Sequence, residues 1–248
     1  MSVKSVIVDV CQRLDARAFV ANHDGNVSVR LSEDRFLATP TSFAKRDIKE
    51  NDLLLVDFAG KVLEGPHRVF SEWVWHQAIY GARPDAQAVV HAHPPVASGF
   101  GLARRELGTP CLPEAIVSLG RHISNIDFYS PLDPALAQSG SRFENDIAAA
   151  LADSDAFIAP GNGVWAVGRG ADAVLQAYLR LELVEQVARQ HEAALSLGGP
   201  KPLDADLVEA LLKKRPRVQS GAQAPSPAAP LDLEALKDIV RQELDALA

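Results

Sequence analysis

The sequence predicts an α/β protein in which helices cover a mixed, largely antiparallel sheet. Apolar residues recur at helical spacing in several long segments, whereas short apolar or alternating segments bounded by turn residues indicate strands. These strands and helices follow one another without a strict strand–helix–strand rhythm and without a glycine-rich phosphate loop at the first strand. The 248 residues, 47% of them hydrophobic, suffice for a sizeable core in one domain or in one domain plus an appendage.

The first third of the chain begins with a helix, because apolar residues recur one or two turns apart over residues 2–20. Strands are expected next over residues 23–30 (after an initial turn), 35–40, 52–57 and 61–64. Residues 70–80 then predict a helix with Ser71 as a candidate N-cap. Glu72 would lie in its first turn, where a negative charge complements the helix dipole.

The remaining two thirds alternate between helices and short strands. We expect a helix from the Pro94-Pro95 pair to about Leu107, a strand over residues 126–129, a helix over 134–153, strands over 156–160 and 164–167, and helices over 171–195 and 203–214. Residues 215–230, rich in Pro, Ala, Ser and Gln, indicate a flexible linker, and residues 231–248 an amphipathic helix. That helix would dock on the core of its own chain or, alternatively, on a neighbouring subunit or another protein. The predicted units are therefore a domain over residues 1–197, a short helix and linker over 198–230, and a C-terminal helix over 231–248.

The segment over residues 85–95 predicts a buried strand that ends at His93 and is closed by Pro94 and Pro95. Side chains alternate across a strand, so His91 and His93 project from the same face. Two neutral imidazoles that converge at a strand end suit Zn²⁺ or a similar divalent metal. The pair alone fits equally well with two unrelated histidines, because two ligands do not make a site.

Composition narrows the class of protein. A net charge of −7 with both signs interspersed argues against a nucleic-acid-binding surface. No run approaches the roughly 18 apolar residues of a membrane helix, and the start lacks the pattern of a secretory signal. Two cysteines, Cys11 and Cys111, imply no disulfide framework and are expected as small core residues. We expect a cytoplasmic protein.

Five short motifs occur in order along the chain: Gly25-Asn26-Val27-Ser28, Thr39-Pro40-Thr41, Ser71-Glu72, His91-Ala92-His93-Pro94 and Gly163-Val164. Each is weak alone, but together, in this order and at these spacings, they make the chain resemble the class II aldolase/adducin family over about residues 5–195. The resemblance to the fuculose-phosphate-aldolase-like branch implies an αβα sandwich around a central, mainly antiparallel sheet. It also implies a homotetramer with sites at its subunit interfaces.

By this resemblance, His91 and His93 match two metal ligands and Glu72 matches the catalytic acid/base. The expected cofactor is Zn²⁺, or another divalent metal such as Mn²⁺ or Fe²⁺. In such aldolases the ion chelates the carbonyl and the adjacent hydroxyl of the substrate and stabilises the enediolate left by carbon–carbon cleavage. Without the resemblance, Glu72 would be interpreted as a helix-start charge.

The sequence departs from the family pattern at the third metal ligand, where Asn162 occupies the position of a histidine. An amide oxygen is a poorer zinc ligand than an imidazole. Three outcomes stay open: Asn162 binds through its oxygen, Glu72 or His122 completes the shell, or the metal is lost. A Gly-Asn-Gly turn also has a purely conformational explanation, since Asn and Gly tolerate positive φ.

The substrate pocket departs as well. By the resemblance, Asn26, Thr41, Ser42 and Ser71 contact the anionic end of the substrate, although Ser42 stands where a glycine is common. His23 stands where a threonine is common, and Phe70 replaces a serine, which makes an apolar or aromatic substrate more plausible. Glu114 occupies about the place of a tyrosine donated across a subunit interface, and either enters a neighbour's site or forms a salt bridge.

The predicted function is a divalent-metal-dependent class II aldolase-type lyase. It would cleave a carbon–carbon bond of a small hydroxy-carbonyl substrate, a sugar phosphate or related small acid, through a metal-stabilised enediolate. The alternatives are a decarboxylase of a hydroxylated aromatic acid, and an adducin-like interaction module that has lost catalysis. The expected partners are a small-molecule substrate and further copies of the chain, with neither nucleic acid nor membrane.

Overall fold

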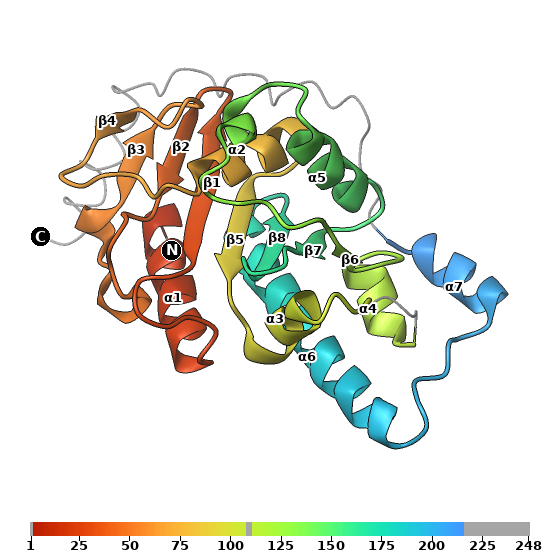
Figure 1. Cartoon of the computed structure of the whole chain (residues 1–248). Helices are drawn as coiled ribbons and strands as arrows, with labels where there is room; N and C mark the ends of the chain where they lie inside the picture. The colour runs from red at the N-terminus through yellow and green to blue at the C-terminus, as the bar shows by residue number, and fades with distance from the viewer. Residues whose placement is uncertain (1, 108–110, 216–248) are drawn as a thin grey trace, which may run out of the picture.

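The computed structural model describes residues 2–107 and 111–215, which form strands and helices in close alternation (Figure 1). Eight strands occur in this part of the chain: β1 (Asn26–Ser32), β2 (Arg35–Ala38), β3 (Leu54–Val56), β4 (Val62–Glu64), β5 (Ala88–Ala92), β6 (Ser124–Asn125), β7 (Ala156–Ile158) and β8 (Val164–Gly168). The α-helices are α1 (Val3–Ala16), α2 (Trp73–Ala82), α3 (Pro95–Leu102), α4 (Pro113–Ser118), α5 (Arg142–Ala152), α6 (Ala173–Ser196) and α7 (Ala205–Leu212). None of the helices in these ranges is long and apolar enough to cross a membrane.

The strands form one sheet in the order β4-β3-β2-β1-β5-β8-β7-β6. All neighbouring pairs are antiparallel except β6 and β7, which are parallel. The prediction of a mixed, mainly antiparallel sheet is therefore confirmed. The strand that carries the two histidines, β5, lies between β1 and β8 and is buried along its whole length.

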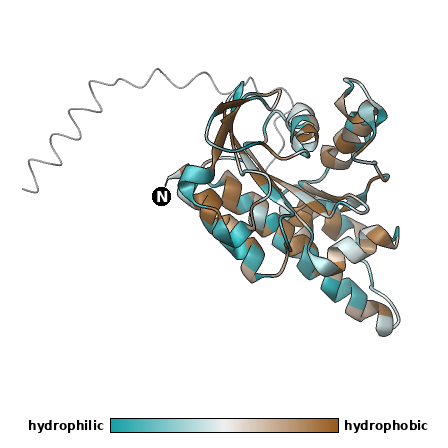
Figure 2. Cartoon of the chain, turned by 60° about the vertical axis from the view of Figure 1, so that its left-hand side comes forward, coloured by the Kyte–Doolittle hydropathy of each residue, from teal (hydrophilic) through white to brown (hydrophobic). Residues whose placement is uncertain are grey.

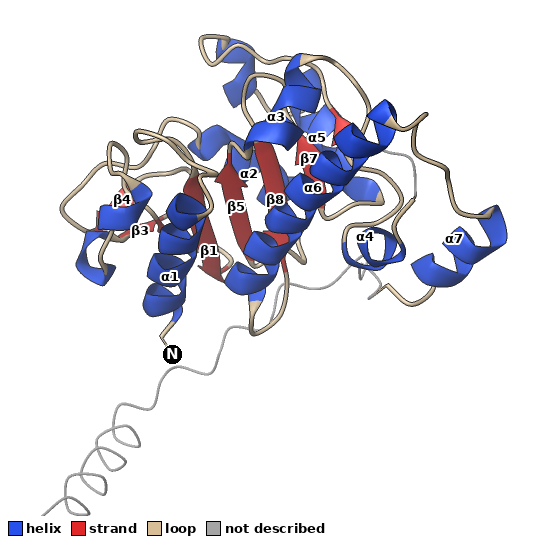
Figure 3. Ribbon diagram, turned by 90° about the horizontal axis from the view of Figure 1, so that it is seen from below, coloured by secondary structure: helices blue, strands red, loops and turns tan. Residues whose placement is uncertain are grey.

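Helices cover both faces of the sheet. One hydrophobic core lies between the sheet and α1, α3 and α6, and a second lies between the sheet and α2 and α5 (Figure 3). The helices turn hydrophobic stripes toward the strands, whereas hydrophilic residues gather on their outer sides (Figure 2). This arrangement is the predicted αβα sandwich.

Strand alternation decides what faces each core. Val90 and Ala92 of β5 belong to the core under α1 and α6, so His91 between them projects toward α2. On the neighbouring strands, Val27 faces the first core, and Trp165 faces the second. Polar residues on β1 and β5 can therefore meet residues of α2.

The structure corrects the start of α2. The helix begins at Trp73, and Glu72 is its N-cap, so the prediction of Ser71 as the N-cap is wrong. The side chain of Glu72 makes no capping hydrogen bond to the helix, because its carboxylate is held by Asn26 instead.

Other boundaries also differ from expectation. The helix after His93 ends at Leu102, before a residue with positive φ, Arg104 (φ 53°). The helix expected over residues 134–153 is split, because Gly140 adopts φ 72° and Ser141 caps a new helix, α5. The strand expected over residues 126–129 lies instead at Ser124–Asn125, and α4 was not predicted. The predicted linker and C-terminal helix lie outside the described residues, apart from the start of the linker.

Candidate active site

The site lies where β1, β5 and β8 run side by side. In the ladder, Asn26 pairs with His91, and His91 pairs with Trp165. Residues directly opposite one another on neighbouring strands point to the same face of a sheet. These three side chains therefore form one row beneath the start of α2.

His91 has a fixed tautomer and a free nitrogen. Its side chain is fully buried, and its ring stacks on Trp165 with the centroids 3.9 Å apart. Nδ1 lies 3.1 Å from the carbonyl oxygen of Val164, to which an Nδ1–H donates. The other ring nitrogen, Nε2, is buried and has no hydrogen-bond partner among the described residues. A buried nitrogen of this kind is a ready ligand for a metal ion.

His93 lies beside His91, with ring centroids 4.9 Å apart. Burial, with a smaller contribution from the nearby His91, lowers the pKa of His93 to about 4. The ring is therefore neutral near pH 7. The turn after β7 packs directly on it: a Cβ at Gly163 would lie 3.1 Å from His93 Cγ and 2.3 Å from the carbonyl oxygen of Ala92. Gly163 also has φ 66°, so glycine is required there.

Glu72 completes the group from the start of α2. Its Oε1 lies 3.6 Å from Nε2 of His91, and its Oε2 accepts a hydrogen bond of 2.7 Å from Nδ2 of Asn26. Burial opposes ionisation of this carboxyl, but His91 and the hydrogen bond from Asn26 outweigh it and lower the pKa of Glu72 to about 2. Two predicted metal ligands and the predicted acid/base are thus brought together.

The donor set fits a divalent metal in part. His91 and His93 offer two imidazole nitrogens, and a carboxylate oxygen faces one of them. Within residues 2–107 and 111–215, however, no three His, Cys, Asp or Glu side chains are grouped closely enough to hold an ion by themselves. A third ligand would have to come from an amide oxygen, from a movement of Glu72, from water or from substrate.

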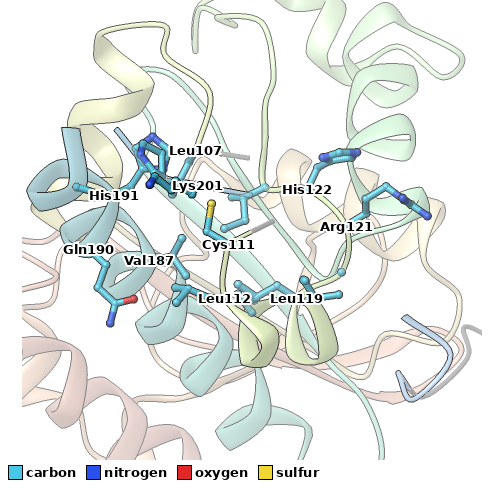
Figure 4. Close-up of a pocket in the computed structure, with 16 residues that line it drawn as sticks. Leu107, Cys111, Leu112, Leu119, Arg121, His122, Val187, Gln190, His191 and Lys201 are labelled. Atoms are coloured by element: carbon cyan, nitrogen blue, oxygen red, sulfur yellow. The ribbon is translucent and has the colours of Figure 1, made fainter. Parts of the chain in front are cut away.

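Asn162 lies in the turn between β7 and β8, next to the glycine that packs on His93. The main-chain carbonyl oxygen of Asn162 accepts a hydrogen bond of 3.1 Å from the indole nitrogen of Trp165, and this bond fixes the turn. His122, the other candidate for a third ligand, lines a separate, largely apolar pocket with Cys111 and His191 (Figure 4). His122 precedes β6, near the start of β7, whereas Asn162 follows the end of β7. Asn162 is therefore the better placed of the two.

The predicted substrate-binding residues lie partly together. An isolated bridge between Pro40 and Val69, and a hydrogen bond from the Thr41 N–H to the carbonyl of Arg68, bring the turn of Thr41 and Ser42 beside Ser71. Ser42 and Ser71 are exposed, and Ser42 has φ 65°, a conformation that glycine favours. The side chain of Asn26, by contrast, is buried and already bonded to Glu72.

Glu114 is exposed on α4 and lines a groove between α4 and α6, together with Arg17 and Glu182. That groove contains neither histidine of the pair. The roles predicted for Glu114, Asn162 and the substrate contacts remain predictions.

Sequence reasoning missed two groups that support the site. His76 is fully buried and hydrogen-bonded to Asn26 and to Ser28. The spacing Glu72-x₃-His76 could have revealed it, because residues four apart lie on the same face of a helix. Lys45 is only 2% exposed, and its Nζ donates to the carbonyls of His23 and Phe43, tying two turns near the site together.

Comparison with known proteins agrees with this geometry. Residues 5–191 match the family described as Class II Aldolase and Adducin N-terminal domain. The chain belongs to this family. Membership confirms the predicted family and, with relatives that are named aldolases, the prediction of an aldolase-type lyase whose reaction is not specified.

Several relatives cover most of the chain. It is 28% identical over 230 residues to the 5-methylthioribulose-1-phosphate/5-deoxyribulose-1-phosphate aldolase of Rhodospirillum rubrum. This match spans 92% of this chain and 98% of the relative. It is 28% identical over 200 residues to the L-fuculose phosphate aldolase of Escherichia coli, with 81% and 87% covered. A solved L-fuculose-1-phosphate aldolase from Thermus thermophilus superposes with a TM-score of 0.63 at 27% identity, over 80% of this chain and 97% of that one. Another L-fuculose 1-phosphate aldolase superposes with a TM-score of 0.73 at 24% identity, over 86% and 95%, and shows the same fold.

Proposed function

We propose that the protein is a metal-dependent aldolase that cleaves a ketose 1-phosphate into dihydroxyacetone phosphate and an aldehyde. Two aldolases with phosphorylated ketose substrates match it over most of their length. In this chain, Thr41 and the exposed Ser42 in one turn, with the adjacent Ser71, supply hydroxyl groups for a phosphate beside Glu72.

His91 and His93 would hold the ion, and Asn162 is the first candidate for a third ligand. A divalent metal bound there would act as a Lewis acid, polarising the substrate carbonyl and stabilising the enediolate that carbon–carbon cleavage leaves. We expect Zn²⁺, with Mn²⁺ or Fe²⁺ as the alternatives if an amide oxygen replaces the third imidazole.

The other roles belong to the chain's own groups. Glu72 would move the proton to and from the reacting carbon through Oε1, since Oε2 is occupied by Asn26. Trp165 stacks on His91 and excludes water from behind it. The turns at Gly25 and Gly163 approach so closely that no larger residue fits beside the histidines.

One observation carries the proposal. Nε2 of His91, which no described residue hydrogen-bonds, lies 3.6 Å from Oε1 of the ionised Glu72. Such a pair is unfavourable in a buried site unless a cation or a proton lies near both. A divalent cation bound beside Glu72 would satisfy both groups.

The test combines elemental analysis with an assay of aldol cleavage. We expect close to one divalent ion per subunit in the purified protein, and release of dihydroxyacetone phosphate from L-fuculose 1-phosphate, 5-deoxyribulose 1-phosphate or 5-methylthioribulose 1-phosphate. A chelator should abolish the reaction, and His91→Ala should lose both the metal and the activity.

His122→Ala is the matched control, because this histidine lies in the pocket of Figure 4, apart from the proposed ligands. It should retain metal and activity. A metal-free wild type whose properties do not change in His91→Ala would contradict the proposal and favour an interaction module. The homotetrameric state and the cytoplasmic location remain expectations, of which the first is checked by light scattering in solution.

A further inference from the structure

Two rows of polar residues meet between α2 and β1. Glu72, His76 and Tyr80 are spaced by four residues at the start of α2 and along its length, and Asn26 and Ser28 are spaced by two on β1. Four residues advance a helix by about 6 Å, and two residues advance a strand by about 6.6 Å. Because these distances nearly match, the two rows stay in register and their side chains interdigitate.

The contacts form one continuous chain of hydrogen bonds. Tyr80 OH lies 2.8 Å from Ser28 Oγ, which lies 2.7 Å from Nδ1 of His76. Nε2 of His76 lies 2.5 Å from Oδ1 of Asn26. Nδ2 of Asn26 lies 2.7 Å from Oε2 of Glu72. The chain thus runs from the buried core to the carboxylate of the site.

Chemistry fixes the direction of every bond in it. An ionised carboxylate only accepts, so Asn26 must present its NH₂ group to Glu72 and its oxygen to His76. His76 must then donate from Nε2–H, which leaves Nδ1 as an acceptor for the Ser28 hydroxyl. Ser28 in turn accepts from the phenol of Tyr80. All the donors therefore point toward Glu72.

The surroundings keep His76 in this state. Its side chain is fully buried, and the rings of Phe70, Trp73 and Trp165 enclose it at centroid distances of 4.9, 5.6 and 5.3 Å. This burial, with His91 nearby, lowers the pKa of His76 to about 3, so the ring is neutral at ordinary pH. A neutral ring has one donor and one acceptor, as the chain of bonds requires.

This hydrogen-bond chain is unsuited to carrying protons. The amide of Asn26 in its middle has no titratable proton to pass on near neutral pH, and its far end is the buried phenol of Tyr80. The hydrogen-bond chain can, however, orient the amide of Asn26 and, through this amide, the carboxylate of Glu72.

We propose that His76 is a positioning residue: it locks the amide of Asn26 so that Oε2 of Glu72 is held and only Oε1 faces the substrate. The proposal rests on the proposed function, because it gives Glu72 the proton transfer. If His76 loses its donor, Asn26 can rotate and turn its own oxygen toward the carboxylate. Glu72 then loses the hydrogen bond from Asn26 and the orientation that it fixes.

A first experiment tests the hydrogen-bond chain itself in metal-free protein. Long-range proton–nitrogen NMR spectra of protein labelled with ¹⁵N-histidine should show the ring of His76 at neutral pH, assigned by its loss in His76→Gln. The expected result is a neutral ring protonated at Nε2. A ring protonated at Nδ1, or at both nitrogens, would overturn the proposal whatever the enzyme's activity.

A second experiment measures the consequence for catalysis with the metal-loaded enzyme. His76→Leu should lower kcat about 10- to 100-fold, the range seen when groups behind a site residue are removed, with KM and bound metal little changed. His76→Gln places an amide nitrogen near the position of Nε2 and should recover most of kcat. Ser28→Ala should cost less than His76→Leu, and Tyr80→Phe least, because the direct donor to Asn26 remains.

Ile79→Ala is the matched control, since Ile79 is fully buried on the same helix but outside the hydrogen-bond chain. It should lower thermal stability and leave kcat unchanged. Equal losses in His76→Leu and His76→Gln, or a loss confined to KM, would overturn the positioning role. A wild type inactive on every ketose 1-phosphate would instead overturn the proposed function, while the NMR result would still decide the hydrogen-bond chain.

Discussion

The two ends of the same strands carry buried polar clusters of opposite character. At one end, Asp155 precedes β7 and Asp85 precedes β5; with four arginines they form the arginine cluster, defined by Arg83, Asp85, Asp155, Arg169, Arg180 and Arg215. At the other end lies the histidine cluster, defined by Glu72, His91 and His93. Helix α2 joins them, since its N-cap is Glu72 and its C-cap is Arg83.

The arginine cluster is closed. Asp155 is fully buried, and each of the four guanidinium groups lies within 3.0 Å of one of its oxygens. Arg83 also donates to the carbonyls of Leu151 and Ser154 at the end of α5. Oδ1 of Asp155 and two nitrogens of Arg215 also make no hydrogen bond, but their groups are held in ion pairs of 2.9 and 2.8 Å. The histidine cluster is open, because Nε2 of His91 is equally buried, makes no hydrogen bond to a described residue and lies 3.6 Å from Oε1 of Glu72. Buried charges that are paired with opposite charges hold a fold together, whereas a buried ring nitrogen without a hydrogen bond is available to bind a metal ion.

The largest expected effect on folding follows from opening the closed cluster. Asp155→Asn should lower the free energy of unfolding by about 3–5 kcal/mol, because it leaves buried guanidinium groups without their counter-charge. Urea unfolding measures the change, and kcat of the folded fraction should stay the same. Asp127→Asn, which removes an exposed partner of Arg142, is the control and should change stability little. A loss of activity without a loss of stability would contradict the division of roles.

The converse change is made at the open cluster. Glu72→Gln keeps an acceptor for Asn26 but removes the proton-transferring carboxylate. We expect kcat to fall about 10²- to 10⁴-fold, and the free energy of unfolding at pH 7 to fall by no more than about 3 kcal/mol, because the depressed pKa of Glu72 shows that the folded state favours its ionised form. Steady-state kinetics and urea unfolding give both numbers, with the exposed Glu64→Gln on β4 as the control. An unchanged kcat in the folded Glu72→Gln variant would show that this carboxylate belongs with the structural groups.

A third change adds a metal ligand to the histidine cluster. Asn162→His places an imidazole in the turn beside His93 and should raise the affinity for Zn²⁺ about 10- to 100-fold. Competition with a chromogenic chelator measures the affinity. An unchanged affinity would mean that the side chain at position 162 does not reach the ion.

The smallest effect concerns pH. Burial alone would raise the pKa of Asp85, but two hydrogen bonds from Arg83 outweigh it and lower the pKa below its usual value. A group with a depressed folded-state pKa stabilises the fold fully above its unfolded pKa, near 4, and this contribution is lost as pH falls through the folded pKa. Wild type should therefore exceed Asp85→Asn in stability at pH 7 by on the order of 1 kcal/mol, and the gap should narrow below pH about 4. A gap that is constant with pH would exclude the ion pair as its cause.

The sequence predicts well which side chains share a face, where apolar residues recur at the period of a strand or helix. The alternation of β5 placed His91 and His93 on one side, and their rings do lie 4.9 Å apart. Predicted boundaries are wrong where a single residue decides them: Ser71 is the predicted cap of α2 but Glu72 is the cap in the structure, and the left-handed Gly140 divides the helix expected over residues 134–153. A periodic pattern extends across such a residue because periodicity does not report φ.

The sequence by itself determined the class of fold, the histidine pair at a strand end and a glutamate at the start of the preceding helix, since each depends on spacings of a few residues. Tertiary structure alone decided that β1 and β8 flank β5, and this pairing sets Asn26, His91 and Trp165 in one row. It also decided that His76 supports the site and that four distant arginines surround Asp155. These contacts join residues 14 to 74 positions apart in the chain, as in the pairing of His91 with Trp165 and of Arg169 with Asp155. Strand order fixes such contacts, and no local pattern in the sequence encodes strand order.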